Sequence, residues 1–196
     1  MAETPSTANG PAITVTSTAA PTVFALDPSS SAFNVPLHAY MGSHPGFDGI
    51  GTGAMVFNPQ GKLLLLQRAA HDSFPLRWEV PGGAVDSEDE TLLHAVAREL
   101  WEESGLRAEG IGEALEPAEV LVSTRGLRVC KRSFIVQVNQ YEVKLDPNEH
   151  EAFVWASEEE VRAKKCGEVV LEFTSPSHEQ TIYNAFDTRK EKQRVG

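Results

Sequence analysis

The sequence has few cysteines and no long apolar run. Only Cys130 and Cys166 occur among its 196 residues, and they do not form a CxxC pair. Disulfide frameworks and structural zinc sites need more clustered ligands than this, so we expect two reduced thiols in an intracellular protein. No apolar stretch approaches the roughly 18 residues that a membrane-spanning helix requires, which excludes such a helix.

Basic residues are also scarce. The chain has 17 Lys and Arg against 28 Asp and Glu, which gives a formal charge of −11. A protein this acidic is a poor candidate for binding a phosphate backbone through bulk charge. We therefore expect a small-molecule partner, with neither a nucleic acid nor a membrane as partner. To bind an anionic ligand, the protein would need a local source of positive charge, such as a metal ion.

The first 31 residues are rich in Thr, Ala, Ser and Pro and show no helical or strand period. This composition predicts a disordered or loosely attached tail over residues 1–31, followed by a single domain over residues 32–196. No Lys or Arg precedes Lys62. The positive region of a secretory signal and the arginines of a mitochondrial transit peptide are therefore missing, and the expected location is the cytoplasm.

Apolar runs predict the first strands. Alternation over 33–37 favours a short strand, and Pro36 within it favours an edge position. The runs over 51–57 and 62–68 flank a turn sequence and predict a β-hairpin. Four consecutive leucines, 63–66, indicate a strand that is covered on both faces.

The rest of the chain alternates between strand and helix patterns. Further strands are expected within 77–83 and at 119–123, 128–138 and 153–156, and helices are expected at 90–104, after Ser157, and at 177–190. Asp89 or Ser87 is expected to cap the first of these helices, and Gly105 to end it. This order predicts an α/β fold in which a mixed sheet packs between helices.

The helix over 90–104 carries an acidic face. Glu99, Glu102 and Glu103 are spaced i, i+3 and i+4, which places three carboxylates side by side. Such like charges repel each other unless cations compensate them, and a divalent metal suits oxygen ligands. An ordinary solvated helix face is the alternative. The Pro-Gly-Gly turn upstream and Arg98 beside the carboxylates favour the metal.

The segment from Pro81 to Leu106 resembles the Nudix box, G-x5-E-x7-R-E-U-x-E-E-x-G-U, where U is an aliphatic residue. Residues 98–106 match its second half at every fixed position, and Glu90 lies eight residues before Arg98. Gly83 stands one residue further from Glu90 than the pattern allows. Either Glu90 or Asp89 therefore takes the first acidic position. The predicted hairpin and the residues at 67–69 and 78–83 also look like those of Nudix, or MutT-like, domains.

The resemblance implies a Nudix-type α/β/α sandwich and a metal-dependent hydrolase. The implied substrate is a nucleoside diphosphate linked to another group, cleaved at its phosphoanhydride bond. The implied cofactor is Mg²⁺ or Mn²⁺, held by Glu99, Glu102, Glu103 and the Gly83 carbonyl, with Arg98 orienting the carboxylates. The residues fit this chemistry independently, because the reaction needs charge neutralisation, a positioned water and a base. The alternatives are a non-nucleotide substrate, such as a prenyl diphosphate, and a non-catalytic binding module, which the retained carboxylates disfavour.

The general base is open at this point. Acidic residues before a Trp-containing strand serve this purpose in many members of the family, which favours Glu149, with Glu151 second. Glu103 itself is another candidate, and the acids at 145–151 can also be read as an ordinary polar turn. His150 and His94 are further candidate metal ligands.

Residues that bind the substrate are the least determined. Arg68, Arg77 and Lys131 are candidates for contacts to phosphate oxygens, and Trp78 is a candidate for stacking on a base. The alternative is that these are surface charges and a core aromatic. Further candidates are Arg125, Arg128 and Arg132 among the cations, and Phe74 and Phe134 among the aromatics. Either a monomer or a homodimer is compatible with the sequence.

Overall fold

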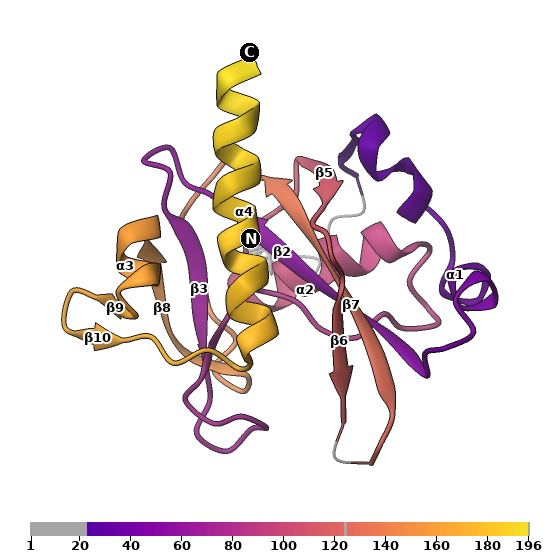
Figure 1. The fold of residues 1–196 in the computed structure, drawn as a ribbon, viewed down its shortest axis with the longest axis horizontal. Coiled ribbons are helices and arrows are strands. Elements are labelled where there is room, and N and C mark those ends of the chain that lie inside the picture. The colour runs from indigo at the N-terminus through magenta and orange to yellow at the C-terminus, as the bar shows by residue number, and fades with distance from the viewer. Residues whose placement is uncertain (1–22, 124, 196) are drawn as a thin grey trace, which may run out of the picture.

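The computed structural model describes residues 23–123 and 125–195. Their strands form two main sheets with helices around them (Figure 1). The larger sheet has the order β1 (Ala25–Leu26), β5 (Gly110–Ala114), β7 (Arg128–Gln137) and β2 (Gly49–Val56), and β6 (Glu119–Val122) also pairs with β7. Strand β2 runs parallel to β7, whereas β5 and β6 run antiparallel to it. The predicted mixed sheet is therefore confirmed.

The smaller sheet packs beside it and contains β4 (Trp78–Glu79), β3 (Leu63–Arg68) and β8 (His150–Ala156). A two-stranded ribbon follows, formed by β9 (Lys165–Cys166) and β10 (Val169–Val170). The helices are the 3₁₀ helix η1 (Pro28–Phe33), α1 (Leu37–Ser43), α2 (Leu92–Ser104), α3 (Glu158–Arg162) and α4 (Pro176–Val195). None of the described helices is long and apolar enough to cross a membrane.

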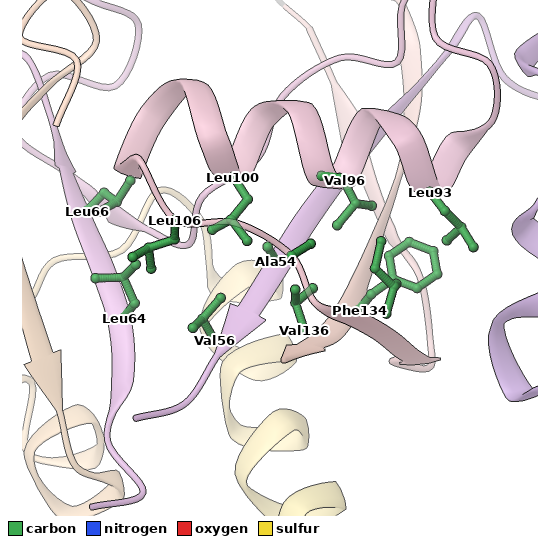
Figure 2. Packing of buried hydrophobic residues seen from close by; sticks show 13 residues of the cluster. Ala54, Val56, Leu64, Leu66, Leu93, Val96, Leu100, Leu106, Phe134 and Val136 are labelled. Carbon is green, nitrogen blue, oxygen red and sulfur yellow. The ribbon is translucent and has the colours of Figure 1, made fainter. Parts of the chain in front are cut away.

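Two apolar clusters lie on opposite faces of the larger sheet. On one face, an apolar stripe of α2 packs against alternate residues of β2 and β7, as Figure 2 shows for Leu93, Val96 and Leu100. On the other face, Ile182 and Phe186 of α4 pack in the cluster that contains Met55. Helices α2 and α4 thus cover the two faces, which gives the expected α/β/α arrangement (Figure 1).

The four leucines of β3 are buried completely. Leu64 and Leu66 belong to the cluster under α2, and Leu63 and Leu65 belong to the cluster under α4. Side chains alternate between the faces of a strand, so a run of four apolar residues requires cover on both sides. The prediction of a doubly covered strand is confirmed.

The predicted hairpin is wrong beyond its turn. Asn58 N donates to Lys62 O at 2.9 Å, and Phe57 pairs with Leu63 in a single bridge. The strands then separate, because β2 pairs with β7 in one sheet and β3 pairs with β8 in the other. Both strands carry apolar side chains on both faces, and each finds a long partner further along the chain.

The predicted edge strand over 33–37 is also wrong, because η1 and α1 occupy this region. Pro36 precedes the first turn of α1, a position where its missing N–H costs nothing. Residues 23–31, the last part of the predicted tail, instead include β1 and most of η1, and Ser30 Oγ donates to Ile111 O at 2.9 Å. The remainder of the predicted tail, residues 1–22, lies outside the described residues.

Helix α2 begins at Leu92, with Thr91 as its N-cap instead of Asp89 or Ser87. Asp89 is unavailable as a cap because its carboxylate binds Arg98. Gly105 ends the helix as predicted, at a φ of 69° that favours glycine. Ser157 caps α3 in a reciprocal capping box with Glu160, so the predicted start of that helix is confirmed.

Candidate active site

A Pro-Gly-Gly turn lies against the larger sheet and faces α2. Ala54 N donates to Pro81 O, and Thr52 N donates to Gly83 O, each at 2.8 Å. Gly82 has a φ of 151°, and a Cβ at this position would collide with the carbonyl oxygen of Thr52. The turn therefore requires glycine at this point, and two hydrogen bonds fix it to β2.

The acidic residues of α2 divide between two environments. Glu103 is buried, and its Oε2 accepts a hydrogen bond from Gly82 N at 2.7 Å. A Cβ on Gly83 would lie 2.6 Å from Glu99 Oε1, so the Glu99 carboxylate also abuts the turn. Glu102 is half exposed. The sequence placed the three carboxylates on one face of the helix, and the structure directs two of them at the glycine turn.

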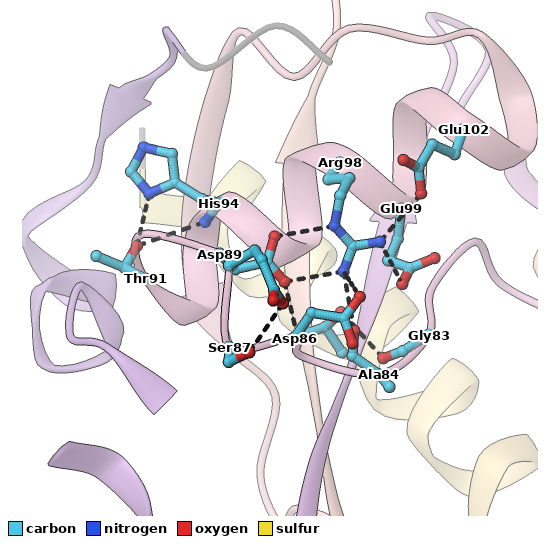
Figure 3. Close-up of polar contacts among 12 residues, drawn as sticks. Gly83, Ala84, Asp86, Ser87, Asp89, Thr91, His94, Arg98, Glu99 and Glu102 are labelled. Atoms are coloured by element: carbon cyan, nitrogen blue, oxygen red, sulfur yellow. Dashed lines mark hydrogen bonds and ion pairs between the residues drawn. The ribbon is translucent and has the colours of Figure 1, made fainter. Parts of the chain in front are cut away.

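Arg98 binds the residues around the turn (Figure 3). Its Nε and Nη2 donate to the two carboxylate oxygens of Asp89 at 2.9 and 2.8 Å. Its Nη1 donates to Glu99 at 2.8 Å and to Glu102 at 3.0 Å, and Nη2 also donates to the carbonyl of Ala84 at 3.0 Å. The hydrogen bonds to Asp89 are the main cause that raises the pKa of Arg98. The geometry is that of a group that orients other side chains.

The structure distinguishes the two candidates for the first acidic position. The Asp89 side chain is 6% exposed and binds the Arg98 guanidinium in a bidentate manner. The Glu90 side chain is 80% exposed, and its Oε2 lies 3.6 Å from His94 Nε2. Asp89 therefore makes the contact with Arg98, and the additional residue lies after it, at the start of α2.

A second group of candidate ligands reaches Glu103 from the start of β8. Glu103, Glu149 and His150 each offer a ligand atom within 4.8 Å of the others. Glu149 is exposed and His150 is buried. Glu151, the second candidate base, is not part of this group. His94 lies at the other end of α2, where it contacts Thr91 and packs edge-on against Phe24.

Buried charged side chains lie next to the group formed by Glu103, Glu149 and His150. Arg68 donates to Glu79 and Asp72, and His150 Nε2 lies 3.5 Å from Glu79 Oε1. Burial raises the pKa of Glu79, but His150, Lys131 and Arg68 outweigh it and lower this pKa to about 2. Neither ring nitrogen of His150 has a hydrogen-bond partner within the described residues. Sequence reasoning missed Glu79, whose only signal was its place before the Pro-Gly-Gly turn.

The electrostatics of the site fit a bound cation. Burial raises the pKa of Glu103 well above its usual range, and three neighbouring carboxylates raise it further. Burial also raises the pKa of Glu99, against the opposing effect of Arg98. Carboxylates that raise one another's pKa in a buried corner are relieved by a divalent ion, and their oxygen atoms suit Mg²⁺ or Mn²⁺. The residues present therefore fit such an ion.

The four substrate-binding candidates occupy different environments. Trp78 is fully buried in the core, and the Arg68 guanidinium is engaged by Glu79 and Asp72. Arg77 is partly exposed and pairs with Glu172 at 2.6 Å. Lys131 lies beside the turn, because the Cβ position of Gly51 is 3.7 Å from Lys131 Cβ and 3.5 Å from Gly83 O.

A family model and several known proteins match this chain. A family model described as the NUDIX domain matches residues 48–189. The chain belongs to the Nudix family. It is similar to the CTP pyrophosphohydrolase of Escherichia coli K12, with 36% identity over 107 residues, which is 55% of this chain and 75% of that protein. It is also similar to the RNA pyrophosphohydrolase of a Psychrobacter species. This match is shorter, with 48% identity over 54 residues, which is 28% of each chain.

Solved structures show the same Nudix fold. A MutT protein from Methanosarcina mazei superposes with a TM-score of 0.57 at 28% identity, covering 72% of this chain and 94% of that one. The NUDIX domain of Shewanella oneidensis NrtR, solved with ADP-ribose, superposes with a TM-score of 0.56. Its identity of 23%, over 83% of this chain and 93% of that one, shows the fold alone. The protein is thus a Nudix hydrolase with an α/β fold.

Proposed function

We propose that this Nudix hydrolase cleaves the phosphoanhydride bond of a nucleoside diphosphate linked to another group, with Mg²⁺ or Mn²⁺ as cofactor. The observation that carries the proposal is the convergence of Glu99 and Glu103 on the glycine turn, with Glu149 at the same corner. The two relatives named as pyrophosphohydrolases support a substrate of this class.

We assign a separate role to each residue of the proposed site. Glu99, Glu102, Glu103 and the carbonyl of Gly83 would hold the ion. When bound, it neutralises diphosphate charge and lowers the pKa of a bound water. Glu149 is the proposed base that accepts the proton of the attacking water, because it is exposed and lies beside Glu103. Arg98 orients the carboxylates, and Asp89 holds Arg98.

The choice between Glu149 and Glu151 as the base can be tested directly. We expect Glu149→Gln to lower kcat by about 100-fold, in the range typical of a lost general base. The loss in Glu151→Gln should be much smaller, since Glu151 lies outside the Glu103 group. The measurement is the rate of product release with Mg²⁺, Mn²⁺ or a chelator. Equal losses in the two variants would remove Glu149 from its proposed role, and undiminished turnover in chelator would contradict the metal requirement.

A second candidate function, a non-catalytic binding module, is disfavoured by the same residues. Every carboxylate of the motif is present, and the structure directs Glu99 and Glu103 at the turn. A module that only binds has no need of a buried, electrostatically unfavourable Glu103.

A further inference from the structure

A hollow of about 500 Å³ lies where the C-terminal half of α4 passes the end of β7 (Figure 1). Its apolar lining comes from the end of β7 and from residues that follow β2 and β7, and it includes Phe57, Ile135, Val138 and Tyr141. Its polar lining comes mainly from α4 and includes Thr188, Arg189 and Lys192. We call this hollow the α4 pocket. Its size and mixed lining are typical of a site for a small molecule.

The α4 pocket is separate from the candidate active site. Phe57 pairs with Leu63 at the start of β3, whereas Arg68 at the end of β3 pairs with His150. Five residues of extended strand span roughly 17 Å, so the two regions lie at opposite ends of β3. None of the carboxylates assigned to the metal lines the pocket. A ligand bound in the pocket would therefore lie away from the proposed chemistry.

Arg189 is held in place at the edge of the α4 pocket. Its guanidinium lies over the ring of Phe57, with 5.2 Å between Cζ and the ring centroid. Phe57 in turn packs edge-on against Phe186, with 5.1 Å between the ring centroids. The guanidinium also abuts Gly61 in the turn before β3, because a Cβ on Gly61 would lie 2.7 Å from Arg189 Nη1. A guanidinium that is stacked in this way is already oriented for a ligand.

The positive charge of Arg189 has no partner among the described residues. Its neighbours on α4 do have partners, since Lys190 pairs with Glu158 at 2.5 Å and Lys192 pairs with Glu113 at 3.3 Å. Arg189 is partly buried, and it makes neither an ion pair nor a hydrogen bond with any described group. Other basic residues already complement the dipole in the last turn of α4. The guanidinium is therefore available to an anion from outside the chain.

The charge of the α4 pocket is opposite to that of the whole chain. The chain has a formal charge of −11, but the described lining contains Arg189 and Lys192 and no Asp or Glu. A guanidinium binds a carboxylate or a phosphate through two parallel hydrogen bonds. The apolar side chains beside it gain free energy when an apolar group covers them. The complement of this lining is an anion with an apolar body.

We propose that the α4 pocket binds an amphipathic organic anion. Its carboxylate or phosphate head pairs with Arg189, and its apolar body covers Phe57, Ile135 and Val138. Such a molecule is a ligand of the folded protein and is not the compound that the protein hydrolyses. The inference goes beyond the proposed function, because it depends on neither the metal ion nor the substrate.

The test compares amphipathic molecules of one chain length and opposite charge. The full chain is titrated calorimetrically with decanoate, decyl phosphate and decyltrimethylammonium, each below the concentration at which it forms micelles. We expect both anions to bind at least about tenfold more tightly than the cation. Non-specific adsorption to a chain with a charge of −11 would favour the cation instead. Binding of the cation as tightly as the anions, or no binding of either anion, would overturn the proposal.

A variant of Arg189 locates the binding site. Arg189→Met removes the charge and keeps an apolar side chain of similar length, so it should weaken the binding of both anions by about 10- to 100-fold. Arg194→Met is the matched control, because Arg194 is exposed on the same helix and does not line the pocket. This control should bind both anions as the wild type does. Equal affinities in the two variants would place the anions elsewhere, the active site included, and would overturn the proposal.

A second variant changes the charge of the lining without removing Arg189. Thr188→Glu adds a carboxylate to the pocket and should weaken the binding of both anions by about tenfold or more. If Arg189→Met does not fold, this variant and the comparison of anions with the cation still decide the question. Unchanged binding in Thr188→Glu would overturn the proposal. Sedimentation tests the other occupant, since a dimer that excludes both anions would show that a second copy of the chain covers the pocket, which would also overturn it.

Discussion

Glu79 is a buried carboxylate that three basic side chains surround. Arg68 donates to it, His150 lies 3.5 Å away, and the charge of Lys131 acts on it from β7. These groups hold its pKa at about 2 in spite of burial. A carboxyl whose pKa is lowered on folding contributes stability above its unfolded pKa and loses that contribution as the pH falls.

We predict that Glu79→Gln lowers the free energy of unfolding at pH 7 by about 3 kcal/mol, because it leaves buried charges without their partner. The difference from the wild type should shrink as the pH falls from 4.5 toward 2, the interval over which the wild-type carboxyl takes up its proton. Urea unfolding at several pH values measures it. A difference that stays constant down to pH 2 would show that the charge of Glu79 contributes nothing.

Asp89 and Glu90 are adjacent acids with different surroundings, and only Asp89 contacts Arg98. We predict that Asp89→Asn weakens Mn²⁺ binding by about tenfold, because Arg98 then loses the partner that aims it at Glu99 and Glu102. Glu90→Gln is the matched control and should bind Mn²⁺ as the wild type does. Calorimetric titration measures Mn²⁺ binding by both variants. A larger loss of affinity in the Glu90 variant would assign the first acidic position to Glu90 instead of Asp89.

Helix α2 is the element that carries the site, and its end depends on one glycine. Gly105 has a φ of 69°, and a Cβ there would lie 3.2 Å from Lys144 Cβ. We predict that Gly105→Ala lowers the free energy of unfolding by about 1 kcal/mol. Gly42→Ala in α1 is the control, since a Cβ there meets nothing within 4 Å. Urea unfolding compares the two variants. Equal losses in the free energy of unfolding would mean that the left-handed conformation of Gly105 does not make its substitution costly.

The elements differ in how far the sequence predicts them. The end of α2 at Gly105 and the start of α3 after Ser157 are local patterns, and the structure confirms both predictions. The hairpin prediction was wrong because strand pairing is not local. The partner of β2 is β7 and that of β3 is β8, and both partners lie more than 60 residues further along the chain. No turn signal between β2 and β3 reveals that choice.

The same distinction applies to the site. The spacing of Glu99, Glu102 and Glu103 within one helix was readable from the sequence, and so was the choice of Glu149 as a candidate. Glu79 meets Arg68 and His150 only through the fold. The role of Glu79 could not be predicted, because this residue alone looks like an ordinary polar position in its own segment.

At the scale of the whole molecule, we expect the buried Glu103 carboxylate to lower the stability of the folded chain when no metal is bound. Burial and neighbouring carboxylates raise the pKa of Glu103, so its ionisation above pH 4.5 disfavours the folded state. We predict that Glu103→Gln melts at a higher temperature than the wild type at pH 7.5 in chelator. This advantage should shrink as the pH falls and vanish below 4.5, the ordinary pKa of the carboxyl, where the wild-type group is protonated in both states.

Saturating Mg²⁺ should reverse the order of the two melting temperatures, because the wild type gains stability from the bound ion and Glu103→Gln gains less. Melting curves with chelator and with Mg²⁺ measure both effects. A wild type that melts at the same temperature in both solutions would contradict the assignment of a metal site to this corner.

The central claim is that the carboxylates of α2 make this chain a metal-dependent diphosphate hydrolase. The most direct test measures product release from a panel of nucleotide and prenyl diphosphates with Mg²⁺ or Mn²⁺, for the wild type and for the double variant Glu102→Gln, Glu103→Gln. We predict turnover of nucleotides by the wild type and none by the double variant. A folded wild type that binds these compounds without turnover, or a double variant that turns them over equally well, would contradict it.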